Sequence, residues 1–108
     1  MSPQLPQPLS GYFEAQNAHA IDAMLSAFSD RASVRDEGKD LSGHAAIRAW
    51  LEDTSRKYRV TVTPLAVARA GDETVVTTKV AGTFPGSPIE LSYRFTIEAD
   101  KIVRLAIG

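Results

Sequence analysis

Asp36 and Tyr12 have side chains and sequence contexts that suit proton-transfer chemistry. Asp36 ends a short alternating segment in which Ala32 and Val34 share its face of a predicted strand. If that face points into the core, burial should raise the pKa of the carboxyl group and suit it to general base catalysis. The alternative is structural, because aspartate is also a favoured turn residue and a polar turn follows at residues 37–40.

Aromatic residues with polar tips are the other candidates. Tyr12 lies on the apolar face of a predicted helix, where its hydroxyl group needs a partner that could be a ligand oxygen, although core packing is an alternative. Trp50 and Tyr93 fit either a pocket wall or ordinary core. His19 and His44 stand far apart, without the acid pattern of a catalytic triad.

The composition excludes several kinds of site. Cysteine is absent, which rules out disulfides, thiolate nucleophiles and zinc–thiolate centres, and no histidine pair or EF-hand pattern predicts a metal. We therefore expect no cofactor. The net charge of −1 provides no basic field for nucleic acid. No stretch approaches the ~18 apolar residues of a membrane span, and residues 1–10 lack a signal-peptide pattern, so we expect a cytoplasmic protein.

Apolar periodicity predicts three helices in one domain. The chain has 108 residues, 44% of them hydrophobic and 23% charged, as in a single globular unit. We expect a flexible segment at residues 1–7 and a domain at residues 8–108. Helical spacing predicts helices at residues 8–17, at residues 21–28 and, after an N-cap at Ser42, through about residue 57.

Alternating residues predict the strands. A short strand is expected at residues 32–36, and four more follow the third helix, near residues 59–67, 73–84, 91–98 and 102–107. A phase slip at Pro64 indicates a β-bulge that bends the sheet. Because helices and strands are largely segregated along the chain, the fold class is α+β with a curved, mostly antiparallel sheet.

This order of elements resembles the nuclear transport factor 2-like superfamily, most closely its SnoaL-like branch of polyketide cyclases and related ketosteroid isomerases. The specific part of the resemblance is residues 12–47. It implies a cystatin-like cone of three N-terminal helices packed on the sheet, a pocket for a small apolar molecule and a homodimer formed through the sheet.

The resemblance also implies site residues. In the steroid isomerases a tyrosine of the first helix donates to the oxyanion and an aspartate at the end of the first strand moves the proton; Tyr12 and Asp36, 24 residues apart, match them. A second acid of those enzymes falls near Ser92, with Glu90 as a loose substitute. Because losing an oxyanion donor typically costs ~10²- to 10³-fold in rate, we expect a changed reaction rather than steroid isomerisation.

Two functions from different classes follow. The first is an isomerase, cyclase or hydratase with Asp36 as base and Tyr12 as donor. The second is a non-catalytic ligand-binding or dimeric protein-interaction module, which the mixed strand surfaces around Val75, Lys79 and Arg94 would fit. The expected pocket residues are Phe13, Gln16, Phe28, Val34, Trp50, Tyr58, Ser92 and Tyr93.

Overall fold

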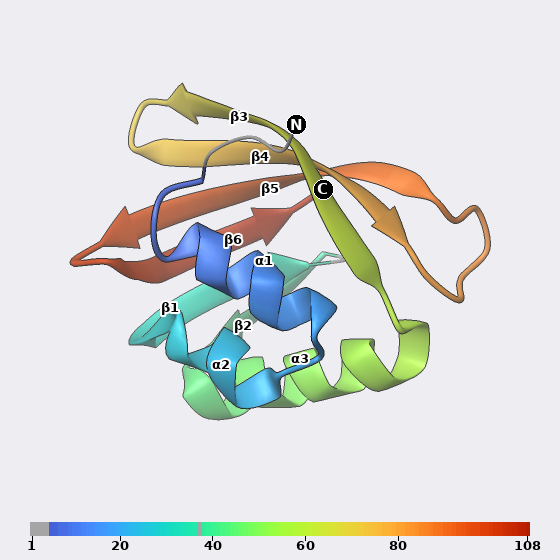
Figure 1. Ribbon diagram of the computed structural model, residues 1–108. Coiled ribbons are helices and arrows are strands. Elements are labelled where there is room, and N and C mark those ends of the chain that lie inside the picture. The colour runs from blue at the N-terminus through green and yellow to red at the C-terminus, as the bar shows by residue number, and fades with distance from the viewer. Residues whose placement is uncertain (1–4, 37) are drawn as a thin grey trace.

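The computed structural model describes residues 5–36 and 38–108, apart from the side chain of Tyr58. Three helices pack against one face of a curved sheet, as Figure 1 shows. The helices are α1 (Leu9–Asn17), α2 (Ile21–Ser26) and α3 (His44–Tyr58). None of the helices in this part of the chain is long and apolar enough to span a membrane.

The sheet has six strands in the order β2-β1-β6-β5-β4-β3. All neighbouring strands are antiparallel except β1 and β6, which run parallel. The strands are β1 (Phe28–Asp36), β2 (Lys39–Ser42), β3 (Thr61–Ala70), β4 (Glu73–Ala81), β5 (Ile89–Glu98) and β6 (Lys101–Ile107). The predicted α+β class and mostly antiparallel sheet are confirmed.

The predicted β-bulge at Pro64 is confirmed. Pro64 pairs with Thr78 and Ala66 pairs with Thr77, so Leu65 is an extra residue in β3. An extra residue on one strand increases the local bend. β3 accordingly curves from the flat part of the sheet towards the end of α3 (Figure 1).

The boundary between the second helix and the first strand was predicted wrongly. α2 ends at Ser26, and Phe28 begins β1 instead of closing the helix. Phe28 fits the helical spacing from Ile21, but it pairs with Ile102 of β6, whose backbone N–H also donates to the carbonyl of Ala27 at 2.8 Å. A parallel pairing with a distant strand overrides the local helical pattern.

The turn predicted through residues 37–40 is shorter in the structure, where Gly38 is a turn residue, and the predicted N-cap at Ser42 was wrong. Lys39 and Asp40 belong to β2, which pairs with β1, whereas residue 37 lies outside the described part of the chain. Ser42 ends β2, and the N-cap of α3 is Gly43, whose φ of +86° favours glycine. Similarly, β4 ends at Ala81 rather than at residue 84.

Two sets of contacts fix α1 against the sheet. An aromatic cluster fills the core, with the Tyr12 ring edge-on to Phe13 and Phe28 at centroid distances of 5.4 and 5.6 Å. Beyond it, the side-chain amide of Asn17 donates to the carbonyl of Val62 and accepts from its N–H, both at 2.8 Å. The end of α1 is therefore fixed to the start of β3.

Candidate functional site

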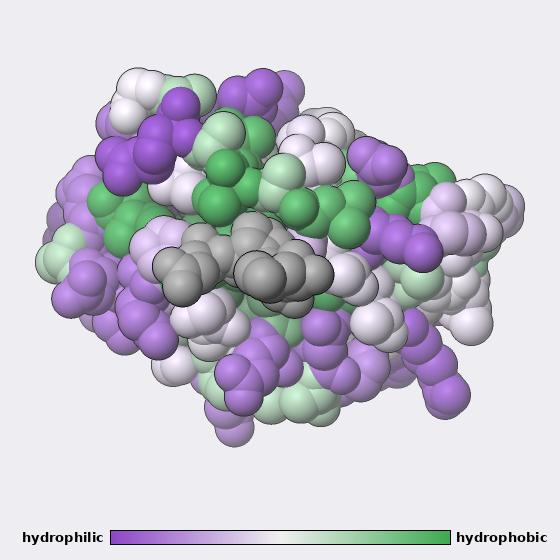
Figure 2. Space-filling model, turned by 45° about the horizontal axis from the view of Figure 1, so that its top comes forward, coloured by the Kyte–Doolittle hydropathy of each residue, from purple (hydrophilic) through white to green (hydrophobic). Residues whose placement is uncertain are grey.

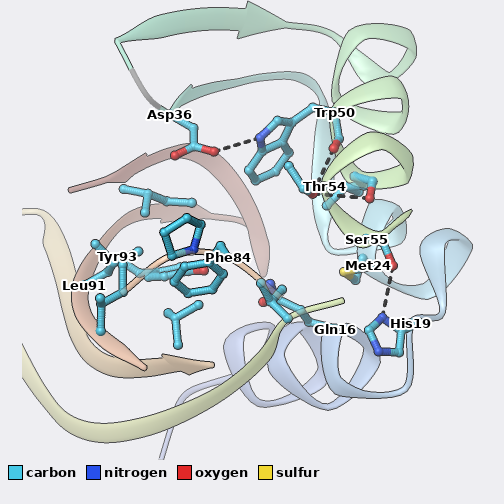
Figure 3. Close-up of a pocket in the computed structure, with 16 residues that line it drawn as sticks. Gln16, His19, Met24, Asp36, Trp50, Thr54, Ser55, Phe84, Leu91 and Tyr93 are labelled. Atoms are coloured by element: carbon cyan, nitrogen blue, oxygen red, sulfur yellow. Dashed lines mark hydrogen bonds between the residues drawn. The ribbon is translucent and has the colours of Figure 1, made fainter. Parts of the chain in front are cut away.

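A cavity of about 290 Å³ lies between the helices and the sheet. Figure 3 shows its lining, which includes residues of all three helices, of the ends of β1 and β6, and of the β4–β5 region. The apolar part of the wall is Met24, Leu51, Val60, Val80, Phe84, Pro85, Ile89, Leu91 and Ile107. The polar part is Gln16, His19, Asp36, Trp50, Thr54, Ser55 and Tyr93. A mostly apolar pocket with few polar groups is typical of a small-molecule site.

Asp36 reaches the cavity because of strand alternation. On the same face of β1, Ala32 and Val34 are buried, with 0% and 1% of their surface exposed, and Asp36 at the strand end is half-buried. The indole N–H of Trp50 on α3 donates to Oδ2 of Asp36 at 3.0 Å (Figure 3). The carboxylate is thus held at the cavity wall by a group from another element.

Tyr93 of β5 supplies a phenol to the same cavity. Burial raises the pKa of Tyr93 to about 12; the side chain of Gln16 acts in the opposite direction, and the charge of Asp36 adds to the rise. A phenol with this pKa keeps its proton at neutral pH. Tyr93 can therefore act as a hydrogen-bond donor but not as an anion.

Tyr12 lies beside this site without lining the cavity. Its side chain is fully buried, and burial together with Tyr93 and Asp36 raises the pKa of its hydroxyl well above the ordinary value. Within the described part of the chain, neither the Tyr12 hydroxyl nor Oε1 of Gln16 has a hydrogen-bond partner. Two buried polar atoms one helical turn apart are therefore unpaired.

The structure brings some of the predicted site residues together. Asp36, Gln16, Trp50 and Tyr93 share the cavity wall. The others lie elsewhere: Tyr12, Phe13, Phe28 and Val34 are core residues that do not line the cavity, Ser92 alternates with Tyr93 and so faces the other side of β5, and the Tyr58 side chain is outside the described structure.

Most of the apolar lining was not predicted. Leu91 shares a strand face with Tyr93, and Leu51 and Thr54 share a helix face with Trp50, so periodicity could have identified them. No local signal in the sequence marks Phe84 or Ile89 on the β4–β5 side of the cavity. Phe84 and Ile89 line the cavity because of the course of the chain between β4 and β5, and that course depends on how the whole sheet is arranged.

The two histidines make structural contacts. Nδ1 of His19 lies 3.0 Å from the hydroxyl of Ser55, and Nε2 of His44 lies 3.0 Å from the carbonyl oxygen of Phe28. Among residues 5–36 and 38–108, no group of three or more His, Cys, Asp or Glu side chains is placed to hold a metal ion. The polar groups of the cavity wall can transfer protons and form hydrogen bonds.

The helices, the curved sheet and the cavity between them define a cone-shaped α+β protein, the architecture of nuclear transport factor 2-like and cystatin-fold proteins. Residues 9–105 match the SnoaL-like domain family, and the chain belongs to that family. A search of curated proteins finds no match to this chain.

Solved structures support the assignment. A protein from Sinorhizobium meliloti, described as a proposed polyketide cyclase, is 38% identical, with a TM-score of 0.92 over 96% of this chain and 95% of its own. A Catenulispora acidiphila protein with a ketosteroid isomerase-like fold is 19% identical, with a TM-score of 0.84 over 97% of this chain and 86% of its own. SalBIII, an epoxide hydrolase/cyclase-like enzyme with a role in pyran-ring formation in salinomycin, is 23% identical. Its TM-score is 0.80 over 92% of this chain and 84% of its own.

Proposed function

We propose that this protein is an enzyme of the isomerase or cyclase kind that moves a proton on a small, mostly apolar carbonyl compound. One observation carries the proposal: a carboxylate, Asp36, is held by the Trp50 indole in the wall of a largely apolar cavity. A base that is poorly hydrated and fixed in place abstracts protons more readily than one in bulk water.

The proposed chemistry uses groups that share the cavity. The Asp36 carboxylate takes a proton from a carbon next to the substrate carbonyl, and the electrons of that C–H bond form an enolate. The Tyr93 hydroxyl donates a hydrogen bond to the enolate oxygen and stabilises its negative charge. Tyr93 is better placed for this role than Tyr12, because Tyr93 lines the cavity and Tyr12 does not.

Two products can follow from the same enolate. If Asp36 returns the proton to a different carbon, the product is an isomer of the substrate. If the enolate carbon attacks a second carbonyl group of the same molecule, a carbon–carbon bond closes a ring and the new alkoxide takes the proton. One relative supports ring chemistry, because it is described as a proposed polyketide cyclase.

The test is hydrogen exchange into a panel of cyclic ketones, because proton abstraction can be measured before the natural substrate is known. Proton NMR in D₂O should show that the protein accelerates exchange next to the carbonyl of at least one ketone. Asp36→Asn should lower this rate by about 10²-fold or more, since general base catalysis contributes about that factor.

The matched control is Asp40→Asn. Asp40 belongs to β2 and does not line the cavity, and its side chain is 72% exposed, so the exchange rate should stay unchanged. Equal exchange by Asp36→Asn and the unmodified protein would reject the catalytic assignment. Ketone binding without any exchange would instead favour a non-catalytic ligand-binding module.

A further inference from the structure

The side chain of Gln16 has an unsatisfied acceptor next to the candidate site. Its Oε1 is buried and has no hydrogen-bond partner within the described residues, as is also true of the Tyr12 hydroxyl four residues earlier on α1. Most buried polar side-chain atoms in native proteins are hydrogen-bonded, so an unpaired one requires an explanation. Because Gln16 also lines the cavity, a ligand group is available as the explanation.

The position of Gln16 determines which kind of ligand group could pair with its Oε1. Figure 3 shows Gln16 across the cavity from Asp36 and Trp50. The side chain of Gln16 interacts with the Tyr93 hydroxyl and lowers the pKa of Tyr93. Oε1 of Gln16 nevertheless has no hydrogen-bond partner within the described residues. The terminal torsion of a glutamine is soft, so rotation of the amide about this torsion can turn Oε1 towards the cavity.

A carboxamide and a phenol offer a defined hydrogen-bond pattern. Tyr93 can donate its O–H, and Oε1 of Gln16 can only accept. A ligand that satisfies both must carry an acceptor and, close to it, a hydrogen-bond donor. A simple ketone has the acceptor alone and leaves Oε1 of Gln16 unpaired.

We propose that Gln16 makes this cavity selective for hydroxy-carbonyl compounds, whose hydroxyl group donates to Oε1 of Gln16 while the carbonyl accepts from Tyr93. The inference rests on the proposed function only in placing the substrate carbonyl at Tyr93. It adds a second recognition point, and therefore a substrate class, to the proton-transfer site.

The test compares binding of three probes: 2-hydroxycyclohexanone, its methyl ether 2-methoxycyclohexanone, and cyclohexanone. The only tryptophan, Trp50, lines the cavity, so its fluorescence reports binding of each probe. The unmodified protein should bind the hydroxy ketone about tenfold more tightly than the methyl ether, because the ether keeps the acceptors but cannot donate to Gln16.

Gln16→Met should bring the affinities for the hydroxy ketone and the methyl ether to within about twofold of each other, because methionine has a similar length but only a weak acceptor sulfur. Its affinity for cyclohexanone should stay within about twofold of the original value. Gln7→Met is the control: Gln7 is exposed before α1 and does not line the cavity, so the tenfold preference should remain.

Each outcome decides the proposal. Equal affinities in the unmodified protein, or a preference that survives Gln16→Met, would overturn the role of Gln16 while leaving proton transfer by Asp36 intact. If no probe binds, both this inference and the ketone-binding site are wrong. A preference for the hydroxy ketone without hydrogen exchange in any ketone supports the Gln16 site and rejects only the proposed reaction.

Discussion

The Asp36 carboxylate experiences two opposing influences in this structure. The apolar residues that share its cavity, including Leu91 and Ile107, offer no stabilisation to a charge. The indole N–H of Trp50, by contrast, donates to Oδ2 and favours the charged form. The hydrogen bond from Trp50 also helps to fix the direction of the carboxylate, and a base needs a fixed direction in order to meet one particular C–H bond.

The buried tyrosines make stability fall at high pH. Burial raises the pKa of Tyr93 from 10.0 to about 12 and that of Tyr12 well above its ordinary value. Above about pH 10 the unfolded chain therefore loses protons that the folded chain keeps, so the free energy of unfolding decreases as the pH rises through 12. Urea denaturation at about pH 9 and pH 11.5 measures the decrease, which should be smaller in Tyr93→Phe.

A decrease of the same size in Tyr93→Phe and in the unmodified protein would contradict this assignment. The comparison is informative because the substitution removes only the titrating hydroxyl and keeps the ring in contact with Phe13 and Phe95. Tyr12 is unchanged in this variant, so part of the pH dependence should remain.

Single residues could be predicted from the sequence only where a local pattern constrains them. Asp36 was found because Ala32 and Val34 precede it on one strand face, and those residues are buried. The difference between Tyr12 and Tyr93 could not be predicted in this way. Both carry a phenol on an apolar face, and only the packing of α1 against β5 determines which of them lines the cavity.

At the scale of elements, local patterns predicted the helices and the hairpins well. The Pro64 bulge and the connection before β5 were visible because proline and glycine restrict the backbone in known ways. The start of β1 and the whole of β2 were missed. Both depend on strand pairing: Phe28 pairs with Ile102, and Asp36 pairs with Lys39. Local periodicity in the sequence does not identify the partner strand.

The outer face of the sheet is the proposed dimer surface. Val75 of β4 is paired with Arg94 of β5, which is paired in turn with Ala106 of β6, so apolar and charged side chains alternate across this face. A mixed face of this kind fits an interface of modest hydrophobicity. We propose a homodimer formed through this face.

Light scattering at micromolar concentration should give the mass of two chains. Val75→Arg places a second positive charge next to Arg94 at the proposed contact and should shift the mass towards one chain. Asp72→Arg, in the exposed β3–β4 turn, is the control and should leave the mass unchanged. A mass of one chain for the unmodified protein would rule out the dimer.

At the scale of the whole molecule, the cavity exists because segments distant in the sequence converge. Four lining residues come from four different elements: α1 supplies Gln16, β1 Asp36, α3 Trp50 and β5 Tyr93. The space-filling view in Figure 2 shows apolar surface continuing between polar side chains on one face of the molecule. No local window of sequence contains such a site, which is why its lining was only partly predicted.

The size of the cavity limits the ligand. A volume of about 290 Å³ is at the lower end of the roughly 300–1,000 Å³ that is usual for ligand pockets. A compact molecule of one or two rings is therefore a better match than an extended chain.

Chemical rescue tests the central claim most directly, because it asks whether the carboxylate of Asp36 is itself the base. Asp36→Ala should lose ketone hydrogen exchange by about 10²-fold or more, and added formate should restore it in proportion to formate concentration, since formate supplies a carboxylate in the space that the side chain leaves. Sodium chloride at equal ionic strength should have no effect. Full exchange activity in Asp36→Ala, or a loss that formate does not relieve, would contradict the account.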